Sequence, residues 1–284
     1  MSESGDAVAQ RELLQQELAD PPVEGALLLD YVLGDESGAR RAVWLLPERA
    51  VLLRPLPGAT VGDRPGAGTI RVSETPENLE FSGVPGRQHD ERLQGNVLIV
   101  ADLHLGKSEA FQRRGIAVPQ VHVETDLERL SALSRRSRAS ELIILGDMFH
   151  EGSASRDDIQ SPLHSHRDHL PERITLVQGN HDRCDLSWLE ALNIQVQDTP
   201  VEKFGLTLAH NPGDIPSEPR GITGVCGHIH PIFTLADAGD RIRLPCFTIH
   251  NCVLTLPAFG SFTGGQRQTA ERVFPVTETE VFEV

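Results

Sequence analysis

A series of apolar runs that each stop at metal-ligand residue types is the feature that most constrains this chain. The first run, residues 97–101, is typical of a buried strand, and Asp102 and His104 follow it. Successive side chains on a strand point to opposite faces, so we expect these two residues to share one side. A carboxylate and a neutral imidazole aimed at one point suit a divalent metal such as Mn, Fe or Zn.

Four further strand-like stretches end in the same way, at residues 141–147, 173–182, 206–210 and 224–231. A lone histidine or aspartate after a strand is most often an ordinary surface or core residue. Chance accounts poorly for five such ends in succession. The polar residues at these four ends are Asp147, then Asn180 with His181 and Asp182, then His210, then His228 with His230.

The order of the expected elements indicates an α/β fold. Strand and helix alternate up to the middle of the chain, and from residue 241 onward the pattern is mostly strand. We therefore predict an α/β sandwich whose ligands lie at the C-terminal ends of the strands. Residues 151–169 read as a polar loop, in which a helical segment is left open. Outside the five stretches above, the expected strands are 26–33, 42–46 and 50–53, with short ones at 70–72 and 79–81, and the expected helices are 8–18 and 123–133.

The 284 residues are enough for a large core, and we expect a single domain over residues 1–284. Residues 1–54 read as an extension before the motif region. Residues 55–94, rich in Pro, Gly and charged residues, read as a flexible insertion. No apolar run approaches membrane-spanning length, and the acidic start lacks a signal pattern. We therefore expect a cytoplasmic location without a membrane partner.

The net charge of −15 weighs against an extended nucleic-acid-binding surface, because phosphate contacts need clustered Lys and Arg. It does not exclude a phosphate-ester substrate. Bound metal ions supply local positive charge where the substrate phosphate sits.

The ordered motif set resembles that of the calcineurin-like metallophosphoesterases over roughly residues 97–231. The matching motifs are Asp102-x-His104, Gly146-Asp147, Gly179-Asn180-His181-Asp182, His210 and Gly227-His228-x-His230. The resemblance implies a sandwich of two mixed sheets flanked by helices. It also implies two divalent metal ions about 3.5–4 Å apart that clamp a phosphoryl group.

Carried over position by position, the resemblance assigns each motif residue a role. Asp147 bridges both metals, and a bridging hydroxide attacks phosphorus in line. His181 stabilises the phosphoryl oxygens or protonates the leaving oxygen, and Asp182 orients His181. Mn²⁺ is the expected metal, with Fe or Zn as alternatives. The first metal takes Asp102, His104 and His230, and the second takes Asn180, His210 and His228.

A finer likeness is to the bacterial DNA ligase-associated metallophosphoesterases. It is carried by residues 100–107, Phe111, Gly115 and above all residues 257–265. This resemblance implies association with a ligase, helicase and nuclease-like repair system and action on DNA.

Three residues outside the motif set are candidates for contact with the substrate. Lys107 and Arg113 follow the first ligand pair and could reach a substrate phosphate, or they could simply be solvated. His150 follows Gly-Asp closely and could line the site.

Three functions follow from these observations. The first is a dinuclear phosphodiesterase or nuclease acting on DNA. The second is a small-molecule phosphodiesterase or phosphatase acting on nucleotides or cyclic nucleotides. The third is a non-catalytic metal-binding scaffold in a repair complex, and His181 argues against it because a scaffold needs no such histidine.

Overall fold

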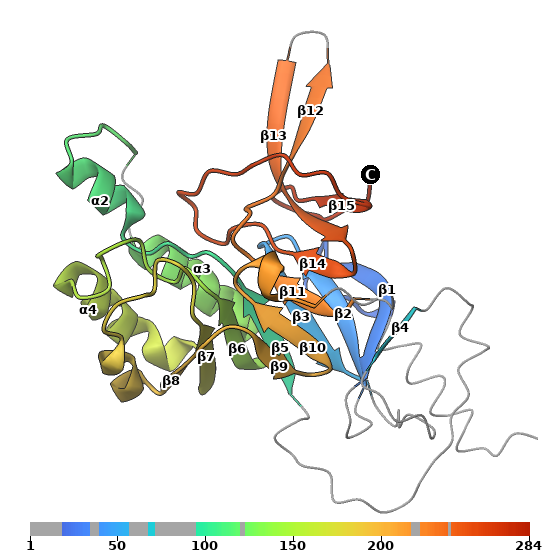
Figure 1. Cartoon of the computed structure of the whole chain (residues 1–284), viewed down its shortest axis with the longest axis horizontal. Helices are drawn as coiled ribbons and strands as arrows, with labels where there is room; N and C mark the ends of the chain where they lie inside the picture. Colours follow the sequence, from blue (N-terminus) through green and yellow to red (C-terminus); the bar gives the residue numbers. More distant parts are fainter. Residues whose placement is uncertain are drawn as a thin grey trace, which may run out of the picture.

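The computed structural model describes residues 19–34, 40–56, 68–71, 95–119, 123–216, 222–237 and 240–284. Within these residues two mixed β-sheets pack face to face, and helices cover the outer face of the first sheet (Figure 1). This confirms the predicted α/β sandwich. The helix predicted at 8–18 and the strand predicted at 79–81 lie outside the described residues, as does most of the insertion predicted at 55–94.

The first sheet changes from antiparallel to parallel at the strand that precedes the first ligands. Strands β1 to β3, β4 and the β3–β5 pair are antiparallel, whereas β5 to β8 run parallel. The sheet order is β4 (Gly68–Arg71), β1 (Leu27–Gly34), β2 (Arg40–Leu46), β3 (Ala50–Pro55), β5 (Asn96–Val100), β6 (Ala139–Leu145), β7 (Arg173–Val177) and β8 (Ile194–Gln197).

The second sheet carries the remaining ligand-bearing strands. Its parallel pairs are β10 with β11 and β11 with β14. Strands β12 and β13 form a long hairpin that projects from the body, at the top of Figure 1. The sheet order is β12 (Ile232–Asp237), β13 (Asp240–His250), β14 (Val253–Thr255), β11 (Gly224–Cys226), β10 (Leu206–Ala209) and β9 (Val201–Lys203), and β15 (Arg272–Pro275) pairs with β13.

The helices lie mostly against the parallel half of the first sheet. In α3 (Val123–Arg136), Leu127, Leu130 and Leu133 recur at helical spacing and are buried in a core shared with that sheet. The stretch predicted at 151–169 as a polar loop with a possible helical segment does contain a helix, α4, because Ile159 and Leu163 give it one buried face. The other helices are α2 (Lys107–Arg113), α4 (Asp157–His166), η3 (Arg167–His169), η4 (Ser187–Leu192) and η5 (Pro212–Asp214).

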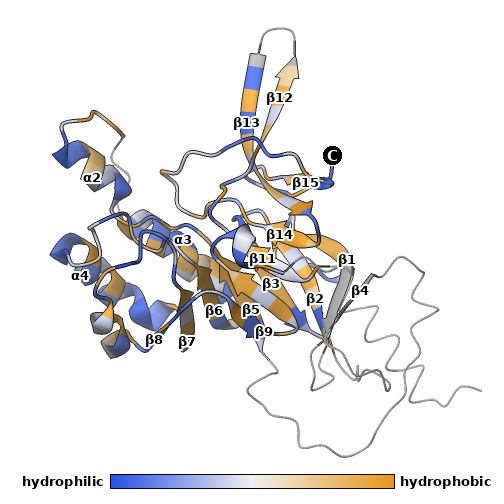
Figure 2. Ribbon diagram, in the orientation of Figure 1, coloured by the Kyte–Doolittle hydropathy of each residue, from blue (hydrophilic) through white to orange (hydrophobic). Residues whose placement is uncertain are grey.

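Two apolar cores hold the layers together, and β5 contributes to both. Its side chains alternate, so Val97 and Ile99 face the second sheet, while Leu98 and Val100 face the helices. A strand buried on both faces reads as a continuous apolar run, and Figure 2 shows β5 and β6 as mostly hydrophobic ribbon. None of the helices in the described residues is long and apolar enough to cross a membrane.

Candidate metal centre

The predicted ligands lie in loops just beyond the strand ends. Strand β5 ends at Val100, and both Asp102 and His104 have a left-handed backbone, with φ of 56° and 48°. Strand alternation is therefore the wrong explanation for why these two residues come together. Two left-handed residues in a loop turn their side chains toward one point.

A left-handed backbone recurs at three more of the predicted ligands. Asp147 has φ 49°, His228 has φ 70° and His230 has φ 50°. Each such non-glycine position costs roughly 1–3 kcal/mol and persists only where its surroundings enforce it. Main-chain hydrogen bonds between loops do so here, for example from the Asp102 amide to Gly146 (3.1 Å) and from the His104 amide to Asp147 (2.9 Å).

Two glycines allow the loops to approach this closely. Gly146 has φ 72°, and a Cβ there would lie 2.3 Å from Nδ1 of His210. A Cβ on Gly179 would lie 2.3 Å from the amide nitrogen of Asp147. Any side chain at either position would displace a predicted ligand.

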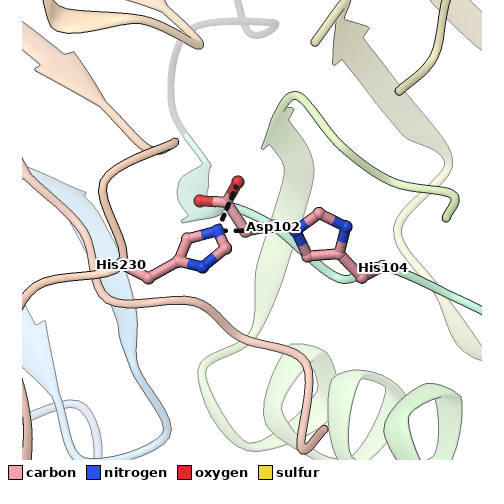
Figure 3. Close-up of side chains that lie close together, drawn as sticks. All are labelled: Asp102, His104 and His230. Atoms are coloured by element: carbon pink, nitrogen blue, oxygen red, sulfur yellow. Dashed lines mark hydrogen bonds and ion pairs between the residues drawn. The ribbon is translucent and has the colours of Figure 1, made fainter. Parts of the chain in front are cut away.

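Asp102, His104 and His230 form the first cluster. Nε2 of His230 lies 3.1 Å from Oδ1 of Asp102 and 3.4 Å from Nε2 of His104. Figure 3 shows the two imidazole rings beside the Asp102 carboxylate, and the planes of the rings are 79° apart. Asp102 is completely buried. These three residues can each direct one ligand atom to a common point.

Asp147, His210 and His228 form the second cluster. Nε2 of His210 lies 3.4 Å from Oδ2 of Asp147 and 3.1 Å from Nδ1 of His228. The same Asp147 oxygen lies 3.8 Å from Nε2 of His104 in the first cluster. Asp147 thus lies between the clusters, where a shared carboxylate ligand has to be.

The residues of both clusters fit divalent metal ions. Oδ1 of Asp102 is buried and accepts no hydrogen bond within the described residues, and it faces Nε2 of His230 at 3.1 Å. A cation bound by both atoms would offset the cost of burying the carboxylate. Nδ1 of His210 donates to the Leu145 carbonyl (3.0 Å), and Nδ1 of His230 donates to the Gly264 carbonyl (3.1 Å). A carbonyl only accepts, so both rings carry a proton on Nδ1, and Nε2 is the ring atom that can bind a metal.

Burial and charge set the protonation of the centre. Burial alone raises the pKa of Asp147, but the hydrogen bond and charge of His210 and the His181 amide hold it well below its usual range. Burial, with the charge of Lys107, lowers the pKa of His104 to about 3. Burial also opposes charge on His210, yet Asp147 and Asp102 raise its pKa to about 9. The His210 ring must therefore release a proton before it binds a cation.

His181 and Asp182 lie beside the clusters. The His181 amide donates to Oδ1 of Asp147 (2.9 Å), and its partly exposed ring has Nε2 3.9 Å from Oδ2 of the same residue. Its ring nitrogen also groups with His104 and Asp147. The buried Asp182 carboxylate accepts hydrogen bonds from the main-chain amides of Gly179 (3.0 Å) and Phe149 (3.2 Å). Asp182 thus ties the two loops that carry Asp147 and His181.

Asn180, Lys107 and Arg113 differ in how they are placed relative to the two clusters. Asn180 is exposed, and within the described residues its amide forms no hydrogen bond with the other predicted ligands. Lys107 is half-buried, and burial lowers its pKa against the opposing charges of Asp102 and Asp147. Arg113 faces α4, where Nη1 lies 3.8 Å from Asp158. It is therefore not directed into the centre.

The ring of His150 stacks on that of His181, with centroids 5.5 Å apart and planes 22° apart. Its buried Nδ1 has no hydrogen-bond partner in the described part of the chain. His150 therefore contributes to the site indirectly, by packing against the ring of His181.

The Leu145 and Gly264 carbonyls, which orient His210 and His230, are functional groups that the motif pattern does not reveal. A main-chain acceptor carries no residue-type signal. The 257–265 motif indicated a family likeness but not the contact that Gly264 makes.

The chain was compared with known proteins. The family model of the calcineurin-like phosphoesterases matches residues 95–245, just over half of the chain. Nuclease MPE of Pseudomonas putida has a solved structure that is 28% identical with a TM-score of 0.58, covering 90% of this chain and 100% of that one. The E. coli phosphoesterase Yfce is 16% identical with a TM-score of 0.36, covering 66% of this chain and 97% of that one. No curated protein matches the chain.

Proposed function

The chain belongs to the calcineurin-like phosphoesterase family and is a metal-dependent phosphoester hydrolase, and from this we propose that it uses two metal ions to cleave phosphodiester bonds in DNA. The observation that carries the proposal is the pair of ligand clusters on either side of Asp147. The nuclease likeness over 90% of the chain supports a nucleic-acid substrate.

The proposed centre assigns one task to each group. Asp102, His104 and His230 would hold one metal, and Asn180, His210 and His228 would hold the other, with Asp147 shared. When bound, the metals supply an acidified water and positive charge that a substrate phosphate can meet. Mn²⁺ is the metal we propose, because mixed carboxylate, amide and imidazole ligands suit it, with Fe and Zn as the other candidates.

His181 is the proposed acid of the reaction. Its amide is held by Asp147, and its ring is about one-third exposed, so a substrate can reach it. A ring in that position can hydrogen-bond a phosphoryl oxygen and donate a proton to the leaving oxygen. His150, stacked on it, limits the ring's movement. Lys107, half-buried beside His104, is the proposed contact for a substrate phosphate.

The biological setting we propose is DNA repair, alongside a ligase, helicase and nuclease-like proteins. Residues 257–265 and the nuclease likeness support this setting. An enzyme that acts on bacterial DNA works in the cytoplasm, so the proposal implies that location.

The net charge of −15 favours a second candidate, hydrolysis of nucleotides or other small phosphodiesters. A small substrate needs only the positive charge inside the centre, whereas a DNA strand also meets the acidic surface around it. The two candidates therefore differ in salt dependence. Moderate salt screens the repulsion between a DNA strand and the acidic surface, so cleavage of DNA should rise with salt, whereas hydrolysis of a small diester should change little.

Hydrolysis of bis(p-nitrophenyl) phosphate with Mn²⁺, with and without a chelator, tests the enzyme class. Activity that survives chelation would overturn the metal mechanism. A parallel screen of DNA and cyclic nucleotides separates the substrate candidates, because the DNA proposal fails if only cyclic nucleotides are cut. His181→Ala should keep Mn²⁺ binding and lose turnover. Full turnover in that variant would remove His181 from the mechanism.

A further inference from the structure

The segment 257–265, which we call the strap, crosses the first cluster and contacts it at both ends. At one end the amides of Phe259 and Gly260 donate to the carbonyls of Ala101 (2.8 Å) and Asp102 (3.1 Å). At the other end the Gly264 carbonyl accepts the proton on Nδ1 of His230 (3.1 Å). The strap therefore holds the backbone of one predicted ligand and the ring of another.

The strap fits closely against the ligand loops. A Cβ on Gly260 would lie 2.2 Å from the Leu103 carbonyl oxygen, and a Cβ on Gly265 would lie 2.4 Å from the His230 carbonyl oxygen. At this separation a shift in the strap moves the main chain on both sides of the first cluster.

Helix α3 anchors the strap through a buried carboxylate. Asp126, which is only 6% exposed, accepts hydrogen bonds from the amide (3.1 Å) and the hydroxyl (2.5 Å) of Ser261. Nη1 of Arg129 donates to Asp126 (2.7 Å), to the Ser261 hydroxyl (2.8 Å) and to the Phe259 carbonyl (3.2 Å). The Arg129 guanidinium also lies 4.6 Å from the centre of the Phe259 ring.

A short surface loop does not need this many side-chain contacts to hold its conformation. Burying a carboxylate is costly unless it is paired and hydrogen-bonded, and Asp126 achieves both by binding the strap. Supporting partners of metal-binding histidines fix the ring orientation, and their loss costs about 10–100-fold in metal affinity or activity. The same reasoning applies to the carbonyl that holds His230.

We propose that Asp126 and Ser261 are positioning residues for the first metal, which act by fixing the strap so that Gly264 holds His230 in its ligand orientation. This inference rests on the proposed two-metal function. It predicts an asymmetry, because His210 in the second cluster is held by the Leu145 carbonyl at the end of β6, and within the described residues no hydrogen bond joins His210 to the strap.

The test uses Mn²⁺ binding, measured by calorimetry, in two single-site backgrounds. His228→Ala leaves the first cluster intact, and His230→Ala leaves the second. In the His228→Ala background, Ser261→Ala should raise the Kd for Mn²⁺ about 10-fold. In the His230→Ala background it should leave the Kd unchanged. Ser261 is exposed, so its truncation is compatible with folding.

Two further variants and a control separate positioning from general damage. Ser261→Thr keeps the hydroxyl and should restore the affinity, and Asp126→Asn should weaken the first cluster at least as much as Ser261→Ala. Ser134→Ala removes a buried hydroxyl from the same helix, where it bonds only the Leu130 carbonyl, and should change neither Kd.

The inference is overturned if Ser261→Ala leaves the first-cluster Kd within about twofold, or weakens both clusters equally. A parent chain that binds no Mn²⁺ would overturn the proposed function together with the inference. A parent chain that binds two ions, with no effect of Ser261→Ala, would overturn the inference alone.

Discussion

The two ligand clusters differ in where their support comes from. The second cluster takes it from β6, whose Leu145 carbonyl holds His210. The first takes it from the strap, which lies beyond the 95–245 match to the family model. One cluster is therefore supported by the sheet itself, and the other by a separate segment that side chains on α3 hold in place.

This difference indicates in which of the two clusters single substitutions can change the metal affinity. A main-chain carbonyl at a strand end changes only if the strand moves, and β6 is buried between two parallel neighbours. The strap depends on the Asp126 and Ser261 side chains, which single substitutions remove. The first cluster should thus vary in metal affinity while the second stays constant.

The largest effect on hydrolysis should come from substituting Asp147, the residue that the two clusters share. Asp147→Asn loses the anionic oxygen near both His104 and His210. Hydrolysis should fall by more than the roughly 100-fold that loss of a supporting partner costs, and calorimetry should show weaker Mn²⁺ binding at both sites. Turnover at the parent level would show that the clusters work independently of Asp147.

Two glycine substitutions should damage one cluster each. Gly146→Ala would place a Cβ 2.3 Å from Nδ1 of His210, and Gly260→Ala would place one 2.2 Å from the Leu103 carbonyl oxygen. We expect each to lower Mn²⁺ affinity about 10–100-fold at its own cluster. Binding to the His230→Ala and His228→Ala backgrounds reports the clusters separately. The comparison breaks down if either glycine variant weakens both clusters to the same extent.

Asn180→Ala should have a smaller effect, confined to the second cluster. The Asn180 amide is neutral and exposed, whereas His210 is buried against Asp147. We expect the loss in Mn²⁺ affinity to be no more than about 10-fold, and smaller than for His210→Ala measured in parallel. An equal loss for the two variants would show that Asn180 is as important a ligand as His210.

The smallest effect should come from the β12–β13 hairpin, which projects away from the main body (Figure 1). Leu235 is 53% exposed there and pairs with Ile242. Leu235→Thr should change the free energy of unfolding by no more than about 0.5 kcal/mol and leave hydrolysis intact. Chemical denaturation and the diester assay measure the two quantities, and a large loss of activity would extend the functional region into the hairpin.

Much of the fold could be predicted because the burial of each element determines how apolar residues are spaced along its sequence. Strands β5, β6 and β7 are buried on both faces and read as continuous apolar runs, and α3 shows one apolar stripe. Strands β8 and β9 were not predicted. They are only four and three residues long, so the alternation of apolar and polar residues in them is too brief to distinguish them from a loop.

The residue types of the centre could be predicted, but its geometry could not. Asp102 and His104 signal ligands by their chemistry, whereas a positive φ at a non-glycine residue leaves no mark in the sequence. Asp126 looks like an ordinary first-turn residue of a helix until the strap, more than 130 residues later, is placed over it. Tertiary contacts of this kind are invisible to local patterns.

The left-handed backbone at five of the predicted ligands affects how the protein responds to selection. Each such position costs the folded chain roughly 1–3 kcal/mol. Glycine would relieve this cost but cannot hold a metal. A screen for heat tolerance alone would therefore favour glycine at these positions and erode the centre. Only a screen that also demands hydrolysis would retain the histidines and aspartates.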